Sequence, residues 1–407
     1  MISFPDVKSL LQPGQRTLAD GSSVLLFPTE STELVRLDLI FDAGYSLQSQ
    51  KLSARAVSKL MPVATRHMNS RQLAEYLDYR GVLTDSSLGL CKNILSVYTH
   101  RRYLEELLPV VDDMICQPAF DEADFEVWRA AKRQEMLAAL KRSPAQARRI
   151  WYHALFGSDH PLGQYSTVED LDRLELKSVA DFHREHYNHC QVIASGNVKN
   201  IHIPFVCEGV TDKQYAVSQP KVTATQQSVV FPIEGAQQTS LRIGRILPEN
   251  DGRLLVLTSL LGGYFGSRLM SNLREDKGFT YGISAHMQEY GDGTTVFYIL
   301  SDVAAGTAQS AVDEVMQELR RLGEEPVSHE ELDVVRNVLA GDAMRALDGV
   351  FERAERWCDI VENGHSWLMA PSFGRILQEV TPDQLCDLAR RHLNPDDMTV
   401  ALAGVCR

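Results

Sequence analysis

Alternating hydrophobic and polar positions predict β-strands in both halves of the chain. The segment 35–41 reads Val-Arg-Leu-Asp-Leu-Ile-Phe, so apolar side chains fall on one face at its start. The segments 93–98 and 295–300 are rich in β-branched and aromatic residues. We therefore expect a strand at each of these three places.

Apolar residues at helical spacing predict a pair of amphipathic helices in each half. Intervals of three and four positions put the apolar side chains on one helix face. The residues are Leu104, Leu107, Leu108 and Val111 in the first half and Val312, Val315, Met316 and Leu319 in the second. A second helix follows the amphipathic helix of each half. In the first half Asp121 and Asp124 mark its start, and in the second half the segment 328–331, Ser-His-Glu-Glu, has capping-box spacing.

The order of these elements repeats along the chain. The apolar segments 192–196 and 400–404 both end in glycine, and the segments before them, 181–188 and 387–394, are also alike. Strands, helices, strands, helices and a final strand thus occur twice. This order predicts an α+β fold of two tandem homologous domains, each a mainly antiparallel sheet covered by helices. We place the N-terminal domain at 1–205, a linker at 206–225 and the C-terminal domain at 226–407.

Composition and charge narrow the class of protein. The 407 residues are 44% hydrophobic, which is enough for two cores. The net charge of −13, without a long run of Lys or Arg, argues against nucleic acid and favours basic peptides as partners. We see neither a signal-peptide pattern nor an apolar stretch long enough to enter a membrane. Seven cysteines without a C-x-x-C pair are expected to be reduced thiols, so we expect a cytoplasmic protein.

The segment 261–281 of the second half carries the most distinctive chemistry. We interpret it as the end of a strand, a break at Gly262 and Gly263, a helix packed through Leu269 and Leu273, a stop at Gly278 and a new strand from Phe279. Arg274 and Tyr281 then lie on either side of a helix-to-strand corner. A tyrosine hydroxyl can donate to a developing oxyanion, and a guanidinium can hold a peptide carbonyl.

These features together resemble the pitrilysin/insulinase family of zinc metallopeptidases, which includes mitochondrial processing peptidase and bacterial two-subunit relatives. The resemblance spans nearly the whole chain. It depends on the order and spacing of four segments, which are 41–44 (Phe-Asp-Ala-Gly), 64–78 with Gly81, 155–163 (Leu-Phe-Gly-Ser-Asp-His-Pro-Leu-Gly) and 262–281. It implies that the two domains form half of a clam-shell chamber.

One departure from this family changes the expected function. Active members carry H-x-x-E-H on a helix, with two zinc-binding histidines, a general-base glutamate and a further glutamate ligand downstream. The matching positions here, counted back from Ala64-Thr65, are Arg55, Ala56, Val57, Ser58 and Lys59. Glu135 stands where the downstream ligand is expected, and a solvated helix glutamate is the favoured interpretation. We therefore predict no metal site and no cofactor on this chain.

Other candidate sites are weaker. His183 and His186 could share a helical face and form a metal pair, but the matching stretch of the repeat keeps only His392. Cys190 is a possible nucleophile near His186 and His189, but no orienting third group is suggested. Glycines between 262 and 266 suggest a phosphate cradle, but the segment lacks the Lys-Ser/Thr of a P-loop. A hydrolase built on these residues is the least favoured hypothesis.

The resemblance implies a role for the remaining pair. In the family, the half opposite the zinc supplies an arginine and a tyrosine that contact the substrate near the scissile bond, and Arg274 and Tyr281 match those positions. Gly262 and Gly263 are the matching substrate-binding candidates. We predict a non-catalytic, substrate-orienting subunit that acts in trans on unfolded peptides. Its partner would be a homologous subunit that carries H-x-x-E-H and the zinc.

Two points stay open at this level. The alternative function is a peptidase-like structural or peptide-binding protein without a catalytic role, as the resemblance to respiratory-complex core subunits allows. The isolated chain is a possible homodimer. Retention of both Arg274 and Tyr281 favours the catalytic interpretation.

Overall fold

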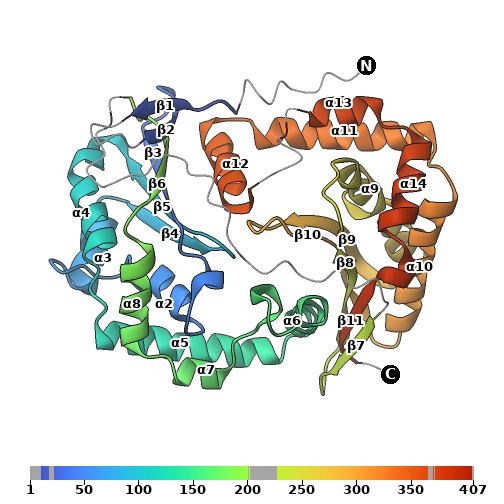
Figure 1. Cartoon of the computed structure of the whole chain (residues 1–407), viewed down its shortest axis with the longest axis horizontal. Coiled ribbons are helices and arrows are strands. Elements are labelled where there is room, and N and C mark those ends of the chain that lie inside the picture. Colours follow the sequence, from blue (N-terminus) through green and yellow to red (C-terminus); the bar gives the residue numbers. More distant parts are fainter. Residues whose placement is uncertain are drawn as a thin grey trace.

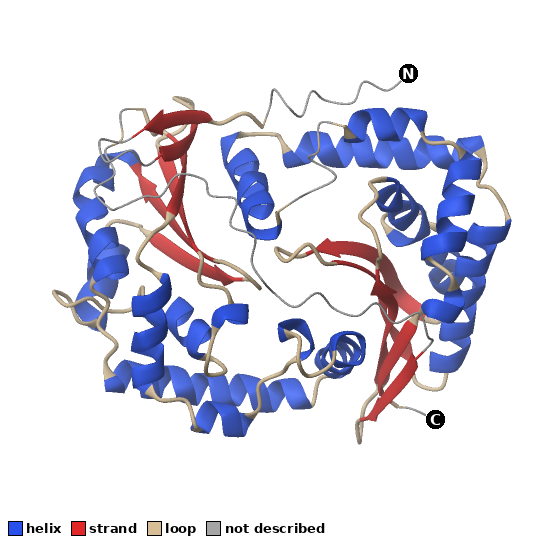
Figure 2. Cartoon of the chain, viewed as in Figure 1, coloured by secondary structure: helices blue, strands red, loops and turns tan. Residues whose placement is uncertain are grey.

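The computed structural model describes residues 11–17, 23–199, 201, 227–364, 370 and 372–405. The fold is α+β, with two mixed sheets and their covering helices lying side by side (Figures 1 and 2). The predicted linker at 206–225 lies outside the described residues, so the domain boundaries stay a prediction. Within the described part of the chain, every helix is too short or too polar to cross a membrane.

The first sheet is built from the N-terminal half. In the described residues it has six strands in the order β1-β2-β6-β3-β5-β4, and only β2 and β6 run parallel. Its strands are β1 (Gly14–Thr17), β2 (Ser23–Pro28), β3 (Leu34–Phe41), β4 (Leu83–Leu88), β5 (Asn93–His100) and β6 (Gln191–Gly196). The predicted strands at 35–41 and 93–98 are confirmed as β3 and β5.

The second sheet repeats this topology, and its described strands match β2, β6, β3, β5 and β4 in that order. Its described strands follow the order β7-β11-β8-β10-β9, and the parallel pair is β7 with β11. They are β7 (Gln227–Pro232), β8 (Gln238–Ile246), β9 (Thr280–Glu289), β10 (Thr295–Ala304) and β11 (Thr399–Gly404). The repeated segments 192–196 and 400–404 lie in β6 and β11, so the internal repeat is confirmed.

Helices cover both sheets, and their ends follow the capping signals. Asp121 accepts a hydrogen bond from the Ala123 amide at 2.7 Å, and Ser328 accepts one from the Glu331 amide at 3.1 Å. The helices are α2 (Ser53–Leu60), α3 (Ser70–Tyr79), α4 (Leu104–Cys116), α5 (Glu122–Leu140), α6 (Ser143–Phe156), α7 (Val168–Asp172), α8 (Leu176–His186), α9 (Arg253–Gly262), α10 (Ala308–Glu324), α11 (His329–Ala346), α12 (Val350–Asn363), α13 (Phe373–Glu379) and α14 (Pro382–His392).

One predicted element is wrong. The residues before Gly262 form helix α9 and not the end of a strand. The run Leu-Leu-Val-Leu-Thr-Ser-Leu-Leu is apolar on almost every side, and all of it except Leu255 is buried. Periodicity cannot separate a strand from a helix in such a run, because neither period leaves a polar face.

Each sheet packs one face on helices of its own half. In the first core, Leu37, Leu39 and Leu95 meet apolar residues of α2, α4 and α8. In the second, Ile243 and Ile299 meet α9, α10 and α14. Apolar burial of this extent is the main favourable term for each half.

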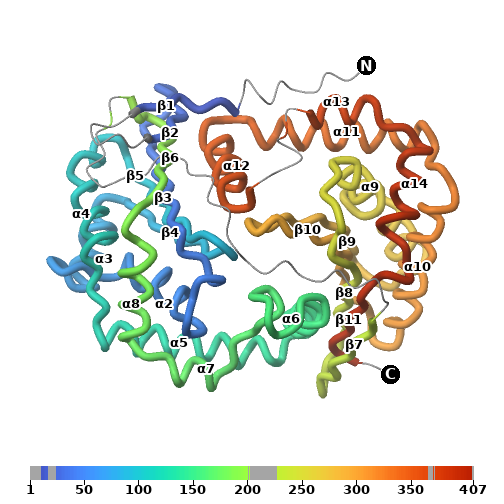
Figure 3. Tube along the Cα trace, viewed as in Figure 1, coloured from blue at the N-terminus to red at the C-terminus, as the bar shows by residue number. Residues whose placement is uncertain are grey.

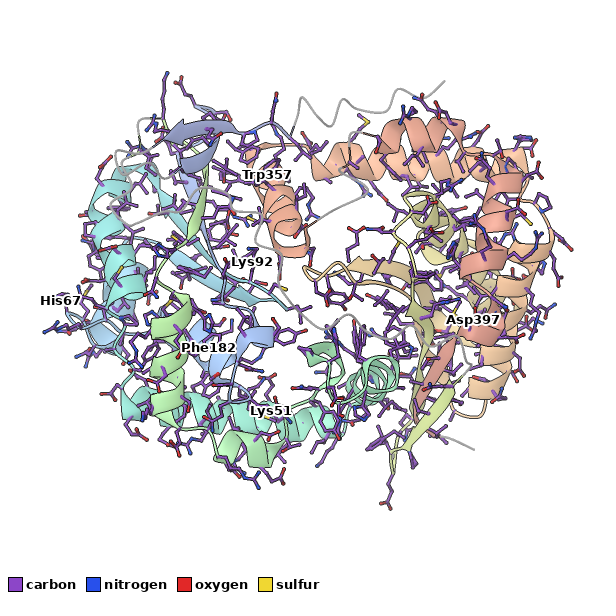
Figure 4. The ribbon with its side chains drawn as sticks, viewed as in Figure 1. Lys51, His67, Lys92, Phe182, Trp357 and Asp397 are labelled. Carbon is purple, nitrogen blue, oxygen red and sulfur yellow. The ribbon has the colours of Figure 1, made fainter. Side chains whose placement is uncertain are left out.

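The opposite face of each sheet is covered by a helix from the other half. Figures 1 and 3 show α6, from the N-terminal half, beside the second sheet, and α12, from the C-terminal half, beside the first. Trp151 of α6 is fully buried and donates from Nε1 to the Thr399 carbonyl at 3.0 Å. Ala354 and Cys358 of α12 pack on Phe27, Ile40 and other residues of the first sheet. Trp357, labelled in Figure 4, lies on this same helix.

A half-buried acid at this crossing makes stability depend on pH. Burial, with a smaller effect of Asp359, raises the pKa of Glu362 on α12 from 4.5 to about 7, although Lys92 opposes the shift. The folded state then holds a proton that the unfolded chain releases. This contribution to stability is present below pH 4.5 and is lost as pH rises towards 7. A shift of this size corresponds to about 3 kcal/mol.

We therefore expect Glu362→Gln to raise the unfolding midpoint at pH 8 and to leave it unchanged near pH 4.5, because glutamine resembles the protonated acid. Urea unfolding at both pH values measures the effect. Glu75→Gln is the matched control, because the Glu75 side chain is 63% exposed and pairs only with Arg71 on its own helix. An equal change at both pH values would contradict the assignment.

Candidate functional site

Helix α2 holds the residues at the zinc-motif positions, and none of them suits a metal. Arg55 is half-buried and Lys59 is exposed, with its ammonium donating to the Ser86 carbonyl at 3.0 Å. Ser58 is buried, and its hydroxyl lies 2.8 Å from that of Ser86. Two cations and a buried hydroxyl replace the imidazole and carboxylate donors that zinc requires.

Polar groups beneath α2 are joined to one another. The Ser86 hydroxyl donates to Asn93 Oδ1 at 3.1 Å, and Asn93 Nδ2 donates to the Tyr187 hydroxyl at 2.9 Å. Burial raises the pKa of Tyr187 well above its usual value, although the bond from Asn93 opposes the shift. The network spans α2, β4, β5 and the end of α8. It is a structural core of satisfied polar groups, with no donor turned towards a metal.

The other candidate residues from the sequence have partners or burial that indicate a structural role. Glu135 is exposed on α5 and pairs with Lys132 at 2.7 Å, which fits the solvated-glutamate interpretation. His183 Nε2 lies 2.8 Å from the Ile115 carbonyl, and burial lowers the pKa of both His183 and His186. Cys190 is buried. Among the described residues, no three His, Cys, Asp or Glu side chains are grouped as a metal site.

The predicted corner around Arg274 and Tyr281 is confirmed. Arg274 lies in the widened, π-helical turns of Met270–Asp276, and Tyr281 is the second residue of β9. Leu269 and Leu273 anchor this helix in the second core, as expected. Gly278 makes the turn with a φ of +64°, a conformation that favours glycine. The Phe279 amide then donates to the Leu273 carbonyl at 2.9 Å, which closes the corner.

A β-bulge directs Tyr281 away from the sheet. The register of β9 and β10 shifts here, so Tyr281 and Gly282 lie opposite Asp302 alone. Ser301 Oγ lies 2.9 Å from Thr280 Oγ1 and 2.8 Å from the Gly282 carbonyl oxygen, and the Thr280 hydroxyl lies 2.8 Å from the Asp302 carbonyl oxygen. Bulges commonly re-aim a side chain beside a functional site. As a result, the Tyr281 side chain is 92% exposed on edge strand β9.

Tyr281 borders a pocket of about 390 Å³ between the second sheet and α6. The walls come from β8, β9, β10 and the start of α6. Arg242 of β8 also lines it, with its guanidinium 4.6 Å from the centre of the Tyr298 ring and 5.4 Å from that of Trp151. Burial lowers the pKa of Arg242. Sequence reasoning missed this residue, although a cation in the middle of a buried strand was a usable signal.

Arg274 is held by an aromatic ring. Its guanidinium lies 4.3 Å from the centre of the Phe265 ring, and Phe265 itself is 63% exposed. Within the described part of the chain, Arg274 forms no ion pair. Stacking leaves the edge of the guanidinium and its forked N–H donors free for a ligand.

The two predicted substrate-binding glycines have different surroundings. Gly262 is buried at the end of α9, and a Cβ there would lie 2.5 Å from the Ala285 amide nitrogen. Close packing of α9 on β9 therefore requires glycine at this position. Gly263 is exposed at the helix C-cap. Gly262 alone sets how closely the helix can approach the strand that carries Tyr281, because a Cβ on Gly263 would meet Ser259 of its own helix.

Comparison with known proteins identifies the family. The family model described as the peptidase M16 inactive domain matches residues 173–339, a range that includes Arg274 and Tyr281. An uncharacterised zinc protease of Streptomyces coelicolor is 24% identical over an alignment of 324 positions, and the match covers 74% of this chain and 66%, just under two thirds, of that protein. Residues 173–339 therefore belong to the M16, or pitrilysin-like, peptidase family.

Solved structures share the fold of this chain. The peptidase M16 inactive domain of Pseudomonas fluorescens superposes with a TM-score of 0.81 at 18% identity, over 97% of this chain and 98% of that one. A mutant of the ferredoxin protease FusC, in complex with Arabidopsis ferredoxin, superposes with a TM-score of 0.74 at 11% identity. That match covers all of this chain and 46% of FusC, so this chain spans about half of that protease.

The segment 155–163 lies where the two halves of the chain meet. Leu155 and Phe156 pack with Ile246 and Val296 of the second sheet. Buried His160 lies 3.3 Å from the Asp292 carboxylate in the turn after β9. These residues hold α6 against the second sheet, and α6 in turn forms one wall of the Tyr281 pocket.

Proposed function

We propose that this chain is the non-catalytic, substrate-orienting subunit of a two-subunit zinc metallopeptidase that cleaves unfolded peptides. The homologous partner would carry H-x-x-E-H and hold the zinc. The observation that carries the proposal is the exposed phenol of Tyr281, on a bulge in the strand that follows the helix of Arg274, in a chain whose own motif positions cannot bind metal.

The chemistry of the pair suits a role in trans. The Tyr281 hydroxyl would donate to the oxyanion that forms when a partner's zinc-bound water attacks a peptide carbonyl. The Arg274 guanidinium would hold a neighbouring carbonyl of the substrate through its forked donors. Both groups stabilise or orient the reacting peptide, and neither can replace the missing general base.

The likeness to FusC is consistent with a second half that acts together with this one. This protein spans 46% of FusC, which leaves room for a second half of similar size in that protease. The proposal gives the missing half to a separate subunit. The ferredoxin in the FusC complex is a protein ligand of that protease, and a polypeptide substrate is proposed here by analogy.

The test is peptidase activity on a quenched, unstructured peptide. This chain, an H-x-x-E-H homologue from the same source and their mixture are assayed separately, with zinc content recorded. We expect full activity only in the mixture, with zinc on the homologue. Arg274→Ala should then lower turnover about 10²-fold or more, because an orienting donor is lost.

Arg320→Ala is the control for Arg274, because Arg320 is exposed on α10, away from the corner. Activity of the homologue that does not change when this chain is added would contradict the proposal. It would favour a structural or peptide-binding role without catalysis. Zinc-dependent activity of this chain alone would contradict both functions.

A milder prediction concerns the bulge. Ser301→Ala removes the hydroxyl that contacts the Thr280 side chain and the Gly282 carbonyl beside Tyr281. We expect the turnover of the mixture to fall several-fold with KM unchanged, and the free energy of unfolding to fall by about 1 kcal/mol. Thr307→Ala is the control, because it removes one hydroxyl bond, to the Ala304 carbonyl, just beyond β10. A larger loss of activity in the control would contradict the positioning role of Ser301.

A further inference from the structure

A second pocket lies on the other side of α6, in front of the altered zinc motif. Its volume is about 320 Å³, and it is enclosed by α2, α6, the segment around Tyr45 and the segment 161–166. Arg55, Arg148 and Arg149 line it, and we call it the arginine pocket. In Figure 4, Lys51 is labelled beside α2 at the edge of this region.

The charge of the arginine pocket is unbalanced. Lys51 is neutralised by Asp170 at 3.2 Å, but among the described residues none of the three arginines forms an ion pair, and no carboxylate lines the pocket. Arg149 lies 3.9 Å from the centre of the Tyr165 ring, and Arg148 lies 5.6 Å from that of Tyr152. These rings fix the guanidinium planes and leave their donors unused.

Two polar atoms in the pocket wall also lack a partner. Arg149 Nε and Gln48 Oε1 are both buried without a hydrogen bond within the described structure. A buried donor or acceptor without a partner costs about 1–3 kcal/mol, so the unbound pocket is not satisfied by the protein itself. Both atoms are enclosed in the wall, so the anionic oxygens of a ligand would bond the outer N–H groups of the arginines that line the pocket.

We propose that the arginine pocket binds a carboxylate of a peptide, either an acidic side chain or the terminal carboxylate. Forked guanidinium donors match the two oxygens of a carboxylate, and tyrosine rings suit the attached carbon chain. The volume holds one or two residues rather than a whole peptide. Only the choice of a peptide as the source of the carboxylate depends on the proposed function.

The position of the pocket favours an extended chain as the ligand. Leu88 ends β4 and lines the pocket, and β4 is an edge strand of the first sheet that pairs only with β5 among the described strands. A peptide lying along this edge would reach the arginines at the end of β4. The overall charge of −13 favours basic peptides, but the side chains that line this pocket are positively charged, so the pocket itself favours an acidic group.

The experiment measures binding of a short dye-labelled peptide to this chain alone by fluorescence anisotropy. Four forms of the peptide combine Glu-Glu or Gln-Gln near the C-terminus with a free or an amidated C-terminus. We expect the amidated Gln-Gln form to bind least. The amidated Glu-Glu form carries only side-chain carboxylates, and the free Gln-Gln form carries only the terminal carboxylate. Tighter binding of either form than of the amidated Gln-Gln form supports the proposal.

Protein variants locate the binding site. The double variant Arg55→Gln with Arg148→Gln should weaken binding of the best peptide about tenfold or more, because charge-assisted bonds are lost. Arg66→Gln with Arg320→Gln is the matched control, because it removes the same charge from exposed positions outside the pocket. Arg55→Lys keeps the charge but loses the fork, and an intermediate loss is expected. Unchanged unfolding midpoints confirm that the variants are folded.

Three results would overturn the proposal. The first is equal binding of all four peptides, and the second is equal weakening of binding by both double variants. The third is binding of inorganic phosphate by a protein that binds no acidic peptide. The assay needs no partner subunit and no turnover. A failure of the paired peptidase therefore leaves this result unaffected, and a failure here leaves the Arg274 and Tyr281 proposal unaffected.

Discussion

Tyr281→Phe is expected to lower the turnover of the assembled peptidase about 10²–10³-fold, with little change in KM. The phenol is 92% exposed and lies on a bulge that holds the backbone in place. Removing one oxygen therefore changes neither packing nor the local chain path. Only the donor to the developing oxyanion is lost, and such donors act mainly in the transition state. Steady-state kinetics on the quenched peptide give kcat and KM separately.

The control for this variant is Tyr79→Phe on α3, because the Tyr79 side chain is 82% exposed in the other half of the chain. Assembly of the pair is followed by sedimentation and should be the same in both variants. Turnover at the wild-type rate would remove Tyr281 from the catalytic role. Loss of assembly would instead make Tyr281 an interface residue.

Trp151→Ala is expected to have the largest effect on stability, about 3–5 kcal/mol. The indole of Trp151 is fully buried between α6 and the second sheet, and its N–H donates to the Thr399 carbonyl. Its ring also packs edge-on against Tyr298 at 5.8 Å. The variant leaves a cavity and an unsatisfied carbonyl at the place where one half covers the other. Urea unfolding measures the loss.

The matched control is Trp128→Ala on α5. Trp128 is only partly buried and packs with the first core, where its ring stacks on Phe125 at 5.9 Å. Since it is not part of the crossing, its loss should cost less than that of Trp151. A cost below about 1 kcal/mol for Trp151→Ala would mean that α6 contributes little to holding the second sheet.

Local signals were enough to predict most of the fold. The strands β3, β5 and β10, the caps at Asp121 and Ser328, and the repeat of the final strand all follow from patterns within a few residues. Helix α9 could not be predicted in this way, because its uniformly apolar sequence has no polar face. The packing of α6 and α12 on the sheet of the other half could not be predicted either, because an apolar stripe on a helix does not identify the sheet on which it packs.

The site was only partly accessible from sequence. The corner between Arg274 and Tyr281 follows from the helix stop at Gly278, but the bulge depends on pairing with Ser301 and Val303 of another strand. The arginine pocket combines Arg55 with Arg148 and Arg149, which are far apart in the chain. Composition gives the sum of the charges and no account of where they gather.

The reciprocal packing of α6 and α12 limits how this protein can move. Each sheet is covered by a helix that belongs to the other half, so a hinge between the halves would strip an apolar face from both sheets at once. Such an opening would cost free energy on two buried surfaces. If the proposed pair admits a long substrate, the chamber must therefore open between the two subunits, and each subunit must move as a rigid body.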